Sequence, residues 1–241
     1  MPSRPSAAVV LLAAAAATAH ADIVDMYFSG PGRGMQVQIE VDDRTISTFA
    51  GQLIHEVTAA DEALESFVGA QPFFCTDVFQ PTSRHTLPFT LTNLTGVPDS
   101  QPMSSTTANA VRSLFASAGQ AQFASDAPDD LAAAFQLALW EVVTDYDALV
   151  GRDSLSLDSG RFSASGPSSQ PLTPSVLARL DTLFSAVGAG EQFLGEVTAF
   201  RSPVAQDQLT AVAGVPATIP TSGSLASFSM GLALAFGRRR R

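Results

Sequence analysis

Two residues of this 241-residue chain are of types that could react with each other. Cys75 is its only cysteine and lies in the run Phe73-Phe-Cys-Thr-Asp77, and Gln136 is the one amide in the apolar run Ala132-Ala-Ala-Phe-Gln-Leu-Ala-Leu-Trp140. In a fold that holds the two together, the Cys75 sulfur could attack the Gln136 side-chain carbonyl and expel ammonia, leaving an internal thioester. A glutamine amide is a poor electrophile in water. The reaction therefore needs the effective concentration of a fixed pair, about 10⁵ M or more, and aromatic neighbours that exclude water.

The same cysteine is open to other readings. A nucleophilic cysteine needs a nearby base, and after removal of an export signal the candidate bases are His55 and His85. One cysteine and two scattered histidines lack the spacing of metal ligands, so we expect no metal and no cofactor. The plainest alternative is that Cys75 is a small buried residue of a strand and that Gln136 hydrogen-bonds a backbone group in the core.

The run that contains Gln136 is predicted to be a helix. Ser125 or Asp126 is expected to cap it, Pro128 suits its first turn, and the two acids that follow favour the positive end of the helix dipole. Gln136 and Trp140 are one turn apart and so share a face. A helix with so little polar surface belongs in a core.

The rest of the chain alternates between strand and helix patterns. Strands are expected over 22–28, 35–41, 44–49, 51–57, 72–79, 85–95, 193–200 and 206–212, with a turn-rich break over 29–34 and strands and turns over 154–162. Helices are expected over 104–119 and 172–187, and a short one over 59–68. These elements predict an α+β fold: an antiparallel β-sandwich or barrel-like sheet with inserted helices, the central one carrying Gln136.

Composition and charge narrow the class of protein. With 46% apolar and 15% charged residues, the chain can build one substantial core. All 13 basic residues are Arg, and 8 of them lie with all 23 acids between Asp22 and Gly214. The net charge of that segment is −15, the difference between 8 and 23. Such a surface repels nucleic acid, which we exclude as a partner.

The N-terminus has the pattern of an export signal. One early charge, Arg4, precedes the apolar run Ala7–Ala17, and Ala19-His-Ala21 is a small-x-small cleavage site. The apolar run is shorter than the about 20 residues that a membrane-spanning helix needs. We expect residues 1–21 to be a signal peptide that is cleaved after Ala21.

The C-terminus resembles the PEP-CTERM sorting tail of exported bacterial proteins. A spacer that begins Val215-Pro216 precedes the apolar segment Leu225–Phe236, and the chain ends in the cluster Arg238, Arg239, Arg240 and Arg241. The Glu-Pro pair of that family's motif is absent, because the spacer reads Val215-Pro-Ala-Thr218. The resemblance implies transient membrane insertion of residues 214–241, with positive charge retained on the cytoplasmic side, and processing peptidases as partners.

The segment between these ends, 22–213, resembles a bacterial thioester domain, a module of surface adhesins. The resemblance rests on two motifs in order, Phe74-Cys-Thr-Asp77 and Phe135-Gln-Leu-Ala-Leu-Trp140. It implies a cross-link between Cys75 and Gln136, in an environment formed by Phe74, Asp77, Phe135, Ala138 and Trp140. It also implies that the thioester reacts with an amine on another surface.

These inferences lead to one preferred function and one alternative. The preferred function is that of an exported, non-enzymatic cell-surface or extracellular protein, transiently membrane-anchored, which attaches covalently to an amine-bearing surface or matrix target. The alternative is a structural envelope or matrix protein in which any cross-link only stabilises the fold. A hydrolytic enzyme ranks third.

Overall fold

The fold is known from a computed structural model that describes residues 22–191, 193 and 195–212. The predicted signal peptide, with Ala19 and Ala21, lies outside the described residues. So does the predicted sorting tail, with Val215, Pro216 and Arg238 to Arg241.

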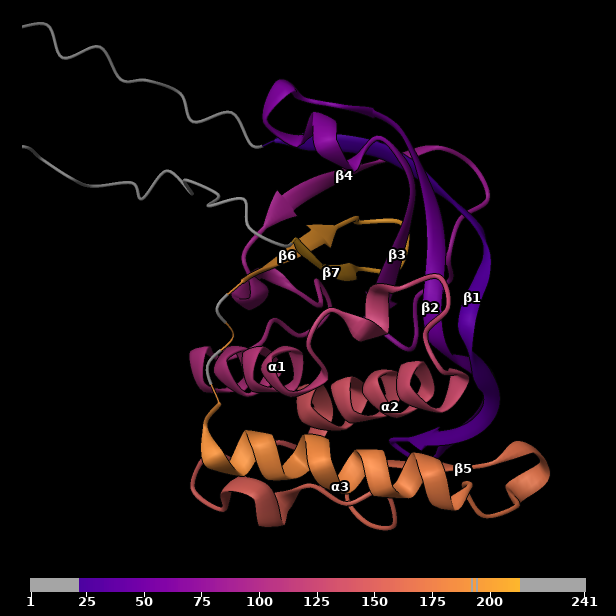
Figure 1. Cartoon of the computed structure of the whole chain (residues 1–241), viewed down its shortest axis with the longest axis vertical. Coiled ribbons are helices and arrows are strands. Elements are labelled where there is room, and N and C mark those ends of the chain that lie inside the picture. The colour runs from indigo at the N-terminus through magenta and orange to yellow at the C-terminus, as the bar shows by residue number, and fades with distance from the viewer. Residues whose placement is uncertain (1–21, 192, 194, 213–241) are drawn as a thin grey trace, which may run out of the picture. The chain divides into compact units, whose positions relative to one another are not determined.

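In the described part of the chain, seven antiparallel strands form the sheet, and six of them close into a ring (Figure 1). Around the ring the order is β1-β2-β3-β7-β6-β4, and β4 pairs again with β1. The seventh strand, β5, pairs with the far half of β1. The bounds are β1 Ile23–Val41, β2 Arg44–Ala60, β3 Gly69–Cys75, β4 Leu87–Thr92, β5 Phe162–Ser165, β6 Glu196–Arg201 and β7 Gln208–Val212.

The first two strands form one long hairpin with two roles. Residues up to Pro31 pair within the ring, whereas Gly34–Val41 and the facing part of β2 extend over the helices. The predicted break at 29–34 is wrong, because pairing continues through this stretch, with bulges between Phe28 and Gly30 and between Pro31 and Gly34. Gly34 and Gly51 lie opposite each other with φ of 145° and 151°, and a Cβ on Gly34 would lie 2.7 Å from the Gly51 Cα. The two glycines therefore permit the close crossing at which the hairpin leaves the ring.

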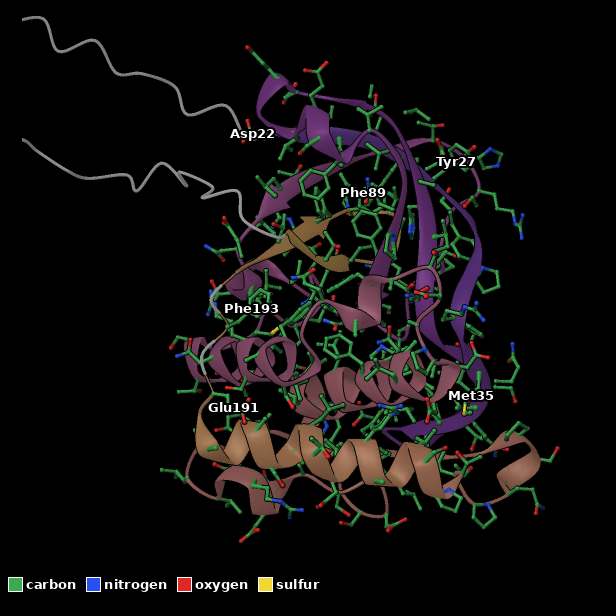
Figure 2. The ribbon with its side chains drawn as sticks, in the orientation of Figure 1. Asp22, Tyr27, Met35, Phe89, Glu191 and Phe193 are labelled. Carbon is green, nitrogen blue, oxygen red and sulfur yellow. The ribbon has the colours of Figure 1, made fainter. Side chains whose placement is uncertain are left out.

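The ring has its own apolar core, made of side chains that alternate inward along the strands. It comprises Val24, Met26, Val57, Phe73, Phe89, Phe200 and Ala205, with Leu64 and Phe67 added from the 3₁₀ turn Glu62–Phe67. That turn replaces the longer helix predicted over 59–68. Phe89, labelled in Figure 2, lies 6.4 Å from the buried imidazole of His55, measured between ring centroids. The ring is thus filled by side chains.

Three helices form a layer beside the ring (Figure 1): α1 Ser105–Ala118, α2 Asp129–Asp145 and α3 Pro174–Ala189. Side chains cap α1 and α3, because the Ser104 and Thr173 hydroxyls accept from the Thr107 and Val176 amides. The predicted cap of α2 is wrong. Its N-cap residue is Pro128, which has no side-chain acceptor, and Ser125 and Asp126 precede it.

The helix α2 is the centre of the larger core. It contacts α1, α3, β5 and the far half of the β1–β2 hairpin, and every residue from Ala132 to Val142 is buried. The 3₁₀ turns Leu94–Gly96, Ala121–Phe123, Gly151–Ser154 and Pro167–Ser169 connect the remaining segments. The predicted α+β class, with a barrel-like antiparallel sheet and a central helix that carries Gln136, is confirmed. None of the helices in the described ranges is long and apolar enough to cross a membrane.

Candidate functional site

Cys75 is the last residue of β3, at the point where one neighbouring strand leaves it. The pairing of β3 with β2 ends at Phe73 and Leu53. On the other side, toward β7, the Thr76 N–H donates to the carbonyl of Asp207, the residue just before β7, at 3.1 Å. Because successive residues of a strand direct their N–H and C=O groups to opposite sides, those of Cys75 face away from β7. They face the edge from which β2 has separated.

The Gln136 side chain occupies that edge. Its Oε1 accepts from the Cys75 backbone N–H at 2.9 Å, and its Nε2 donates to the Cys75 carbonyl at 2.8 Å. The amide thereby takes the place of the missing strand. Cys75 and Gln136 are each 1% exposed, so the contact excludes water. The fold thus brings together the two residues that the sequence singled out, 61 positions apart in the chain.

The Cys75 thiol is held in its protonated form. Burial raises the pKa of Cys75 far above its usual value, and the carboxylates of Asp77 and Asp207 act in the same direction. The Sγ atom donates to the Asp77 backbone carbonyl at 3.1 Å. The Trp140 indole lowers the same pKa, although its N–H makes no hydrogen bond of good geometry with any described residue. Trp140 is therefore a buried donor beside the sulfur whose bonding capacity is unused.

Aromatic rings close the site on the helix side. The Phe74 and Phe135 rings lie 4.6 Å apart between centroids, and Phe115 packs edge-on against Phe135 at 4.9 Å. Phe74 and Phe135 are thus buried next to Cys75 and Gln136 in the chain, and Trp140 lies one turn beyond Gln136. Ala138 is fully buried but lies two residues from Gln136, so it does not share its face of α2.

Asp77 ties the loop after β3 to two other segments. Its carboxylate accepts from the Phe79 N–H at 2.9 Å and from the Ser100 hydroxyl at 2.8 Å. Its backbone carbonyl, which accepts the Cys75 thiol, also accepts from Gln206 Nε2 at 2.8 Å. Asp77 therefore fixes the peptide group that orients the sulfur.

Three site residues before and within β7 were not foreseen: Gln206, Asp207 and Gln208. The Asp207 carboxylate is fully buried and accepts from the Asp99 N–H at 2.5 Å and the Ser202 N–H at 2.8 Å. Burial raises the pKa of Asp207 to about 6, and the nearby carboxylates of Asp99 and Asp77 add to this effect. Three consecutive polar residues in a closing strand are a signal in the sequence. The pairing that places them beside Cys75 is not readable from it.

The histidines do not supply a base to Cys75. His55 lies inside the ring of strands, where burial lowers its pKa to about 4, and its Nδ1 lies 3.4 Å from the Leu53 carbonyl. His85 is exposed in the loop before β4, where its backbone groups bond to Ser83. The arrangement required for Cys-His catalysis is thus not formed. Within the described ranges no three His, Cys, Asp or Glu residues are grouped as metal ligands.

Comparisons with known proteins add no relative: no family model, no curated protein and no solved structure matches the chain. The site is therefore interpreted from its own geometry.

Proposed function

We propose that Cys75 and Gln136 form an internal thioester, and that this exported surface protein uses it to attach covalently to an amine on a surface or matrix target. The observation that carries the proposal is the pair of hydrogen bonds between the Gln136 carboxamide and the Cys75 backbone, at 2.9 and 2.8 Å. They hold the electrophile against the residue that bears the nucleophile.

The local chemistry favours closure of this bond. The Cys75 sulfur forms a bond to Gln136 Cδ, the C–N bond breaks, and the thiol proton leaves with the nitrogen as ammonia. The Cys75 N–H donates to Gln136 Oε1 and so stabilises the negative charge that develops on this oxygen. Because the two residues are held together in the fold, the effective concentration of the thiol is high, and this compensates for the low reactivity of its protonated form. A raised thiol pKa also makes the sulfur a poor leaving group, which protects a closed thioester from hydrolysis.

Export and surface location complete the proposal. The expected signal peptide ends at Ala21, and the expected tail holds the precursor in the membrane before it is processed. N-terminal sequencing of the exported protein should begin at Asp22, and peptide mapping should find no peptide that contains Arg238 to Arg241. A mature chain that starts at Met1 or Pro2, or that retains the Arg cluster, would contradict this part.

A second function has an observation in its favour. Both polar groups of the Gln136 amide are satisfied by backbone, as in an ordinary buried glutamine, and the thiol is protonated. On this reading the pair only joins α2 to β3 in a structural envelope protein. That function predicts a protein of full calculated mass, with a free Cys75 thiol and no reaction with amines.

Intact-mass measurement separates the two. The purified protein should fall short of its calculated mass by one ammonia, and the deficit should vanish in Cys75→Ala and in Gln136→Ala. Gln122→Ala is the matched control, since Gln122 is an equally buried glutamine outside α2; it should keep the deficit. Methylamine should convert Gln136 to its methylamide and release one thiol that a maleimide then labels. A protein of full mass, with a Cys75 thiol that titrates before any amine is added, would refute the thioester.

A further inference from the structure

Gln208 faces the reacting pair from the opposite strand. It lies directly across from Cys75 in the β3–β7 ladder, so the two side chains project from the same face. The backbone bonds of Cys75 point away from β7, which makes this a non-hydrogen-bonded pair, the type with the closer side chains. Gln208 is thus a neighbour of the sulfur on the side that Gln136 leaves open.

The amide of Gln208 is fixed at one end and unused at the other. Its Nε2 donates to the Gln206 carbonyl at 3.0 Å and lies 3.3 Å from Gln206 Oε1. Its Oε1 is buried and has no donor among the residues that the structure describes. The residue itself is 0% exposed. A buried acceptor without a donor is unfavourable for folding, so its place next to the proposed thioester requires an explanation.

We propose that Gln208 Oε1 accepts the N–H of the nitrogen that enters or leaves Gln136 Cδ, and so makes the site selective for amines over other nucleophiles. This inference rests on the proposed thioester. When the bond closes, the departing nitrogen becomes ammonia with an added N–H. When an amine opens it, the C–N bond forms, the C–S bond breaks, and one proton passes from nitrogen to the Cys75 sulfur. In both directions the free nitrogen, as ammonia or as an amine, carries one more hydrogen than the same nitrogen carries in the amide.

The charges around Gln208 suit the same species. A neutral amine becomes positively charged on nitrogen as its bond to Gln136 Cδ forms, and stays so until it loses a proton. The carboxylates of Asp77 and Asp207 lie close enough to the Cys75 thiol to raise its pKa, so they also favour a cation there. Among the described residues, no arginine acts on the pKa of Cys75 or Asp207, and Arg201, at the end of β6, is paired with Asp99 at 3.4 Å. A thiolate nucleophile brings negative charge and no hydrogen to donate, so the same surroundings disfavour it.

The experiment compares two nucleophiles of matched size on the full-length protein. Methylamine and methanethiol are each added to wild type and to Gln208→Met, which keeps the length of the side chain but removes its carbonyl. Intact-mass measurement at intervals gives the opening rate, because each nucleophile adds its own mass to the protein on opening, and the ratio of the two rates cancels differences in access. Thr210→Val is the matched control, because Thr210 is a buried polar residue of β7 whose hydroxyl donates to the Pro72 carbonyl instead.

In Gln208→Met the amine-to-thiol rate ratio should fall by about tenfold, the loss expected for one hydrogen bond in a dry site. It should stay at the wild-type value in Thr210→Val. An unchanged ratio in Gln208→Met would overturn the role of Gln208 and leave the thioester in place. If Gln208→Met does not fold, Gln208→Glu takes its place: it keeps an acceptor oxygen, and a lowered ratio there would also refute the inference. A wild-type protein with no ammonia deficit would overturn both proposals.

Discussion

Opening the thioester should lower the stability of the protein by an amount that the chain separation sets. The cross-link would join residues 61 positions apart. By the chain-entropy model used for disulfides, closing a loop of this length contributes about 4 kcal/mol to the free energy of unfolding. For a domain of this size, 1 kcal/mol shifts the midpoint of thermal unfolding by roughly 2–4 °C. The opened protein should therefore melt roughly 8–16 °C below the closed one.

Thermal unfolding followed by circular dichroism measures this difference. Methylamine opens the bond and leaves Gln136 as its methylamide. Ammonia restores the Gln136 carboxamide and the Cys75 thiol, a pair that the proposal expects to close again, so intact mass must confirm that each opened sample is still open when it is melted. Cys75→Ala treated in the same way controls for effects of the amine on the rest of the fold. Equal midpoints of thermal unfolding for the closed and the opened protein would show that the link does not constrain the unfolded chain.

Three further predictions concern other positions in the fold. Burial raises the pKa of Glu141 to about 8, so stability should fall as pH rises from 4.5 to 8; Glu141→Gln should remove the fall and be more stable than wild type at pH 9 by up to about 5 kcal/mol in urea titrations. Burial lowers the pKa of His55 from 6.5 to about 4, so stability should fall by about 3 kcal/mol as pH drops through that interval; this acid loss should be absent in His55→Phe. Gly34→Ala should cost more than about 2 kcal/mol, because its φ is 145° and Gly51 lies against it. Gly30→Ala, whose added Cβ meets no atom within 4 Å, should be nearly neutral on the same denaturation curve.

Local signals in the sequence were sufficient for some elements. The helices α1 and α3 begin within two residues of the expected starts, 104 and 172, because a hydroxyl that bonds an amide in the first turn is a short-range interaction. The Cys75–Gln136 pair was also found, since an isolated amide in an apolar helix is visible in the sequence.

Long-range features were not predictable in the same way. Turn residues at 29–34 predicted an end to the strand, but bulges absorb them and the long partner strand keeps pairing. The predicted cap of α2 was wrong because burial of the helix over Ala132–Val142 contributes more to its stability than one capping hydrogen bond. Gln208 was missed because its importance depends on register with β3, which is separated from β7 by more than 130 residues.

The closed ring of strands has a consequence for the proposed location of the protein, in many copies on a surface. An unpaired strand edge is a template for association with another chain, and closure gives each of the six ring strands a partner on both sides. Among the described strands, unpaired outer edges remain on the four-residue β5, on β1 between its pairings with β4 and β5, and on the tip of β2. That tip carries Arg44, Thr45, Ser47 and Thr48, and short or polar edges of this kind resist edge-to-edge aggregation. Many copies can therefore be packed side by side while their sheets stay separate.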